Sequence, residues 1–331
     1  MLLRLLATVT ALVTLSATAV AAPRVVASIK PVHSLVAAVM QGVGAPTLLV
    51  SGAGSPHNYA LRPSEARQLQ SAELVVWVGP GMEAFLAKPV ASLGDRARVL
   101  TLIGAPGVDL LAGRSGGIWE AHDDDHHAAD DHADGDHDDH HHDDDHRDDK
   151  HHDDHHHDAS GVDAHIWLDP DNAVAIVRLV AASLSELDPD NAASYRGNAD
   201  RLAARLATMA AGIDADVAAV RTRPYVVFHD AYQYFEHRFA TAAAGAVTVS
   251  PEREPGARRL SQIRRRIVDQ GIVCVFREPQ FEPAIITTIA DGTPARVGVL
   301  DPLGAAIPPG PDAYIVLMQR LTTSLVDCLA G

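Results

Sequence analysis

Short runs of β-branched residues alternate with helical patterns along most of this chain, and that alternation limits the folds available to it. Strands are predicted at 24–29, 46–50, 73–78, 97–101, 225–228, 246–249, 272–276 and 296–300. Helical patterns separate them, and strands linked by helices form parallel sheets covered on both faces. The sequence therefore predicts an α/β fold.

One helical stretch is too long for a single lobe. Residues 191–220 contain no proline and are rich in Ala, Leu and Arg. We expect this stretch to connect two parallel-sheet lobes, with a metal-binding cleft between them. The predicted parts are an N-terminal lobe at 23–188, a connecting helix at 189–220 and a C-terminal lobe at 221–331.

The segment 119–160 has a composition unlike the rest of the chain. It holds 14 of the 19 histidines, interleaved with 17 aspartates, and very few apolar residues. Imidazole and carboxylate are zinc ligands, so several weak zinc sites are expected there. A purely solvating acidic linker is the alternative. Like charges and the lack of apolar side chains predict a disordered insertion within the first lobe.

The insertion also accounts for the charge of the chain. It carries 18 acidic residues against Arg147 and Lys150, so its net charge of −16 equals that of the whole protein. The remainder has no basic surplus of the kind that nucleic-acid-binding proteins show. No nucleic-acid partner is expected.

The first 22 residues have the layout of a secretory signal peptide. Arg4 precedes an apolar run over 5–20, and small residues lead to Pro23, so cleavage is expected after Ala21 or Ala22. A retained membrane anchor is the alternative, although the run is short for a span. Export also predicts that the two cysteines, Cys274 and Cys328, form a disulfide. Two buried thiols, or half of a zinc site, are the other possibilities.

Ligands of open parallel sheets bind beyond the carboxyl ends of the strands, so residues that follow strands are candidate ligands. His57 and His229 follow predicted strands, Asp301 follows the strand at 296–300, and His165 leads from the insertion into a helix. Three imidazoles and one carboxylate form a zinc site if they meet in the cleft. The remaining histidines, His33 and His237, are expected to have packing or surface roles.

Several strings resemble those of the zinc-uptake ABC transporter substrate-binding proteins of Gram-negative bacteria, a group within the metal-binding cluster A-I family. They lie at 55–64, 74–83, 165–170, 228–232, 278–281 and 301–304. The resemblance runs in order from about residue 22 to the end. It includes a His/Asp-rich insertion between the first two ligand histidines and cysteines at the positions of a disulfide.

The resemblance implies a periplasmic, two-lobed protein that holds one tightly bound zinc in the cleft and serves an inner-membrane ABC permease. By motif match His57, His165 and His229 are the imidazole ligands. Some relatives place a glutamate before the first histidine, where this chain has Pro56. Asp301 or a water is then the fourth ligand. Glu278 is a candidate to orient an imidazole, or else a helix-start acid.

Manganese-binding relatives carry a second carboxylate where His229 stands, whereas three imidazoles and one carboxylate suit zinc better. We expect a non-enzymatic, monomeric zinc receptor. A zinc buffer that acts through the insertion is one alternative. A secreted zinc hydrolase is another, although no HExxH motif is present.

Overall fold

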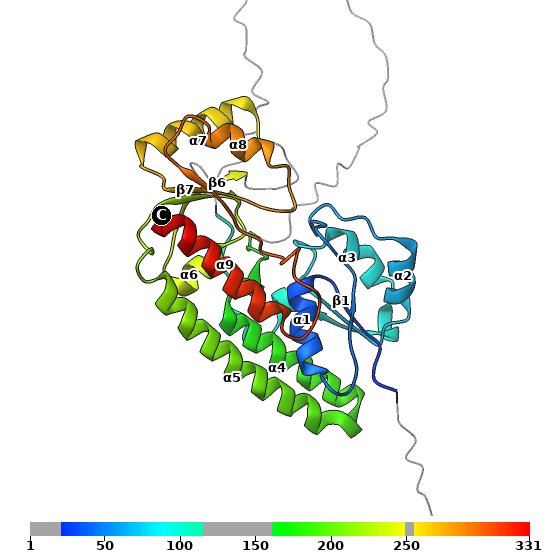
Figure 1. Ribbon diagram of the computed structural model, residues 1–331. Coiled ribbons are helices and arrows are strands. Elements are labelled where there is room, and N and C mark those ends of the chain that lie inside the picture. The colour runs from blue at the N-terminus through cyan, green and yellow to red at the C-terminus, as the bar shows by residue number, and fades with distance from the viewer. Residues whose placement is uncertain (1–20, 115–160, 249–254) are drawn as a thin grey trace, which may run out of the picture.

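The computed structural model describes residues 21–114, 161–248 and 255–331. The predicted insertion at 119–160 and residues 1–20 of the expected leader lie outside the described residues. The fold is α/β, with two four-stranded parallel sheets (Figure 1). This confirms the predicted fold class.

Both sheets have the same strand order. The first has the order β2-β1-β3-β4, with β1 (Val25–Ala27), β2 (Thr47–Leu48), β3 (Leu74–Trp77) and β4 (Arg98–Thr101). The second has the order β6-β5-β7-β8, with β5 (Tyr225–His229), β6 (Ala243–Thr248), β7 (Cys274–Arg277) and β8 (Arg296–Val299). Each sheet therefore brings the carboxyl ends of its strands to one edge, where ligands bind in such folds.

Helices cover the two sheets and join them. Those of the first lobe are α1 (Lys30–Val39), α2 (Pro63–Gln70), α3 (Ala84–Ala91) and α4 (Pro170–Leu187). The long helix α5 (Ala192–Val217) links the lobes, as predicted. The second lobe contributes α6 (Gln233–Phe239), α7 (Ala257–Asp269), α8 (Ala284–Ala290) and α9 (Ala313–Ala330). The part of the chain that is described contains no helix long and apolar enough to span a membrane.

Successive side chains of each strand pack into different apolar clusters, one on each face of the sheet. In the first sheet Val25 and Ala27 belong to the large central core, whereas Val26 belongs to a separate cluster beneath α2 and α3. The second sheet does the same, since Val227 faces the central core and Val226 packs with residues of α7 and α8. Side chains alternate between the faces of a strand, so each sheet is apolar on both sides.

The central core continues from one lobe to the other. The connecting helix α5 packs against α4 and α9, and α9 also packs against α1 (Figure 1). Apolar residues recur along α5 at helical spacing, namely at Tyr195, Leu202, Leu206, Ile213 and Val217. The C-terminal helix thus belongs to the packing of both lobes.

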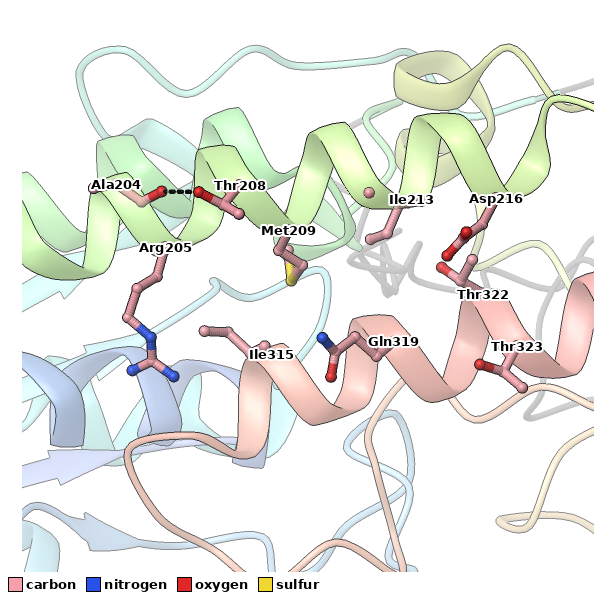
Figure 2. A pocket seen from close by; sticks show the side chains of 11 residues that line it. Ala204, Arg205, Thr208, Met209, Ile213, Asp216, Ile315, Gln319, Thr322 and Thr323 are labelled. Carbon is pink, nitrogen blue, oxygen red and sulfur yellow. Dashed lines mark hydrogen bonds between the residues drawn. The ribbon is translucent and has the colours of Figure 1, made fainter.

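A groove of about 750 Å³ runs between α5 and α9. Figure 2 shows that Met209 and Ile213 of α5 face Ile315 and Gln319 of α9 across it. None of the candidate metal ligands lines this groove. It is a feature of helix packing, separate from the candidate site.

The predicted disulfide between Cys274 and Cys328 is present, and it ties the first residue of β7 to α9. We expect the double substitution Cys274→Ala/Cys328→Ala to lower the free energy of unfolding by roughly 2–4 kcal/mol, because the open chain gains conformational entropy. Urea unfolding of the metal-free protein measures the change. An unchanged unfolding midpoint would contradict the expectation.

Candidate metal centre

Three histidines from distant parts of the chain meet between the lobes. One potential ligand atom from each of His57, His165 and His229 lies within 4.8 Å of the other two. The ring centroids are 5.2–5.8 Å apart. The structure thus brings together the three imidazoles that the sequence indicated.

Each histidine reaches this point for a local reason. His57 follows β2 through a glycine-containing loop, and His229 is the last residue of β5. His165 precedes α4, whose first turn is capped by Asp169, which accepts a hydrogen bond from the Asp171 amide. Strand ends and a capped helix therefore fix the three backbones.

A carboxylate orients the ring of His229. Glu278 follows β7, which pairs with β5, so both residues lie at the same sheet edge. Nδ1 of His229 lies 2.7 Å from Oε1 of Glu278, and the carboxylate is buried. With the Nδ1 proton held by Glu278, Nε2 presents its lone pair to the cleft.

A second carboxylate does the same for His165. Asp163 Oδ1 lies 2.7 Å from Nδ1 of His165 and also accepts a hydrogen bond from the His165 amide. The sequence reasoning missed Asp163. The only available signal was the spacing of two residues, which allows an aspartate to cap the amide that follows it.

The two oriented nitrogens lie at a distance that suits zinc. The Nε2 atoms of His165 and His229 are 3.3 Å apart. Tetrahedral zinc with bonds of about 2.0–2.1 Å places neighbouring ligand nitrogens about 3.3 Å apart. With the proton on Nδ1 in both rings, both Nε2 atoms can coordinate one cation.

Charge and burial also favour a cation. Asp163 Oδ2 and Glu278 Oε2 are buried and have no hydrogen-bond partner among the described residues. Burial, together with the nearby His165 and His229, lowers the pKa of His57 well below its usual value, which keeps this imidazole neutral. Neutral imidazoles backed by buried carboxylates are the form in which histidine binds metal.

The cavity at the histidines is small. Its volume is about 10 Å³, roughly the space of a single water or ion. The lining beyond the histidines is mostly apolar and includes Met82, Trp167 and Phe281. Such a cavity fits an ion rather than an organic molecule.

Glu83 lies directly after the lining residue Met82 and holds the backbone around it. Its fully buried carboxylate accepts hydrogen bonds from Ser28 Oγ and from the amides of Val78 and Gly79. Burial raises the pKa of Glu83 to about 7. The carboxylate joins the ends of β1 and β3 next to Met82, a role that no pattern in the sequence indicates.

Asp301 is not part of the histidine group. Its Oδ1 accepts hydrogen bonds from Gln280 Nε2 and from the amides of Leu303 and Gly304, and its Oδ2 accepts one from the Ala305 amide. The carboxylate thus holds the loop after β8. Its predicted role as the fourth ligand stays a prediction.

The other two histidines lie apart from the group. His33 is buried in α1 and its Nε2 lies 3.1 Å from the carbonyl oxygen of Pro46. His237 is exposed on α6. Neither belongs to the histidine group.

Comparison with known sequences agrees with this geometry. The family described as "Zinc-uptake complex component A periplasmic" matches residues 25–328. The chain belongs to this family. It is 52% identical over 307 residues to the high-affinity zinc uptake system protein ZnuA of Brucella suis, with 92% of this chain and 91% of that protein covered. The protein of the same name from Yersinia pestis is 40% identical over 324 residues, covering 93% and 92% of the two chains.

Solved structures of similar proteins share the fold of this family member. A zinc-bound ZnuA with residues 138–173 deleted gives a TM-score of 0.71 at 21% identity, covering 94% of this chain and 99% of that one. The periplasmic zinc-binding protein TroA of Treponema pallidum gives 0.72 at 18% identity, covering 94% and 100%. At sequence identities of 21% and 18%, this similarity shows a shared fold and no more.

We expect Asp163→Asn to weaken zinc binding about 10- to 100-fold, because a neutral amide holds the Nδ1 proton of His165 less firmly. Competition with a chelator of known affinity measures the change. Asp190→Asn, at an exposed aspartate before α5, is the matched control and should bind zinc like the parent protein. Equal affinity of the two variants would show that Asp163 does not support the site.

Proposed function

We propose that this protein is a periplasmic receptor that captures one Zn²⁺ in the cleft and delivers it to an inner-membrane ABC permease. The observation that carries the proposal is the convergence of His57, His165 and His229, two of them oriented by buried carboxylates. Membership of the zinc-uptake family and the names of the relatives support the choice of zinc and of uptake. The signal-peptide layout of the first 22 residues supports export.

The donor set explains the preference for zinc. Three neutral nitrogens in a tight cavity suit a borderline cation that accepts four ligands, whereas calcium and magnesium require more oxygen donors. Copper and nickel also bind nitrogen sites strongly, so the metal supply of the compartment contributes to selection. The receptor works as a monomer in this proposal, and its cargo is the metal ion itself.

The His/Asp-rich insertion gives the receptor a second, weaker zinc capacity. Its 14 histidines and 17 aspartates offer many ligands of low affinity. In this role the insertion collects zinc or reports zinc sufficiency, and it loses metal as pH falls because a protonated imidazole does not coordinate. A buffer acting mainly through this segment is the second candidate function, and its composition is the observation that favours it.

Deleting residues 120–158 separates the two functions. A receptor lacking this segment should still bind one zinc tightly, and His57→Ala in the same background should abolish that binding, because the site then loses one of three imidazoles. Zinc titration against a competing chelator gives both stoichiometry and affinity.

The matched control is His237→Ala, which removes an exposed histidine outside the group and should leave the tight site intact. Loss of nearly all tight binding on deletion of the segment would favour the buffer. Tight binding that survives His57→Ala would place the site elsewhere.

A further inference from the structure

Three histidines leave one position of a tetrahedral zinc open. The described polar groups that line the cavity, beyond the histidines, belong to Ser55, Glu278 and Gln280, together with the indole of Trp167. Trp167 Nε1 donates to the carbonyl oxygen of Pro302. Glu278 binds Nδ1 of His229 through Oε1, and because Nδ1 and Nε2 point to different sides of the ring, its unpartnered Oε2 does not reach a metal held at Nε2. Asp301 and Gln280, which are hydrogen-bonded to each other, are the next candidates for the fourth donor.

Asp301 is poorly placed to fill the position. Four donors hold its two oxygens, three of them backbone amides of residues 303–305 at distances of 2.6–3.1 Å. Lys30 of the first lobe donates to the carbonyl oxygens of Gly304 and Ala305 in the same loop. Burial lowers the pKa of the Lys30 amine, and the nearby Asp301 carboxylate partly offsets that shift. Turning the carboxylate towards the cleft would leave three part-buried amides without this partner.

Gln280 has the opposite arrangement. Its Nε2 donates to Asp301 Oδ1 at 2.8 Å, and since a carboxylate only accepts, the two ends of the amide are distinguished. Its Oε1 is buried and has no hydrogen-bond partner among the described residues. Gln280 also lines the histidine cavity. A buried amide oxygen without a partner beside a metal cavity is unusual and calls for a ligand.

We propose that Oε1 of Gln280 is the fourth zinc ligand, and that Asp301 positions this amide through its Nε2. The inference rests on the proposed function, since it concerns the zinc held by the three histidines. It assigns Asp301 a positioning role instead of a direct bond to the metal. The sequence string Glu278-Pro279-Gln280 then supplies both an orienting carboxylate and a ligand from one strand end.

The test combines zinc affinity with the spectroscopy of a Co²⁺-loaded protein, using the full mature chain with one equivalent of metal. Gln280→Leu should weaken zinc binding roughly 10- to 100-fold, a loss typical of groups at a metal shell. Asp301→Asn should weaken it less, because Gln280 remains in the cavity. Gln319→Leu, a glutamine of α9 in the groove of Figure 2, is the matched control and should bind like the parent protein.

Water labelled with ¹⁷O identifies the fourth donor directly. The Co²⁺ electron paramagnetic resonance signal of the parent protein should show no ¹⁷O broadening, and the Gln280→Leu signal should broaden as water takes the open position. Broadening in the parent protein would overturn the proposal in favour of a water ligand. A larger loss of affinity for Asp301→Asn than for Gln280→Leu would overturn it in favour of Asp301.

Two further measurements keep the outcomes separate. Thermal unfolding of the metal-free variants shows whether each one folds, and only variants with the parent's transition are compared. His57→Ala tests the proposed function independently. If His57→Ala removes tight zinc while Gln280→Leu leaves affinity and spectrum unchanged, this inference fails and the receptor function stands.

Discussion

Two hydrogen bonds between carboxylates and imidazoles set the chemistry of the cleft. Asp163 and Glu278 accept hydrogen bonds from the Nδ1–H groups of His165 and His229, which leaves the two Nε2 atoms, 3.3 Å apart, free to coordinate a cation. A cation bound by these nitrogens would lie close to two buried carboxylates, and its positive charge would offset theirs.

That arrangement requires the lobes to keep a fixed relation. The connection is more than one long helix, because Trp167 before α4 donates to Pro302 in the loop after β8, and its carbonyl accepts from Tyr314 of α9. Lys30 joins the first helix to the same loop. These buried hydrogen bonds and the continuous central core place the two sheet edges together. The small cavity follows from this packing, since a displacement of either lobe by about 1 Å would separate the nitrogens.

Most of the fold was predictable because its signals are local. Strands such as β3 and β7 coincide with apolar runs rich in β-branched residues, which predict strands. Helix α4 begins where Asp169 and Pro170 predict a helix start. The histidines were also predictable, since His229 ends a strand, His165 precedes a helix and His57 lies in the loop that follows a strand. The β6 strand starts at Ala243, three residues earlier than predicted, because small alanines and a glycine give little strand signal until pairing with β5 extends it.

The parts that the sequence did not reveal depend on side-chain contacts. Asp163 was assigned no role, although it binds both the amide and the ring of His165 two residues further along the chain. The Gln280 amide is held by its bond to Asp301, 21 residues away. Asp301 follows β8 at the position predicted for a ligand, and the amides of 303–305 donate to its two oxygens. The course of that loop, and the packing of α9 against α1 in the other lobe, are tertiary properties that no local pattern carries.

One zinc ion is proposed to bind among the three histidines. Anomalous diffraction at the zinc absorption edge, on crystals of the zinc-loaded mature protein, locates that ion. We expect one strong peak about 2.0–2.1 Å from a ring nitrogen of each of His57, His165 and His229. Ordered zinc found only elsewhere, with no peak among these rings, would contradict it.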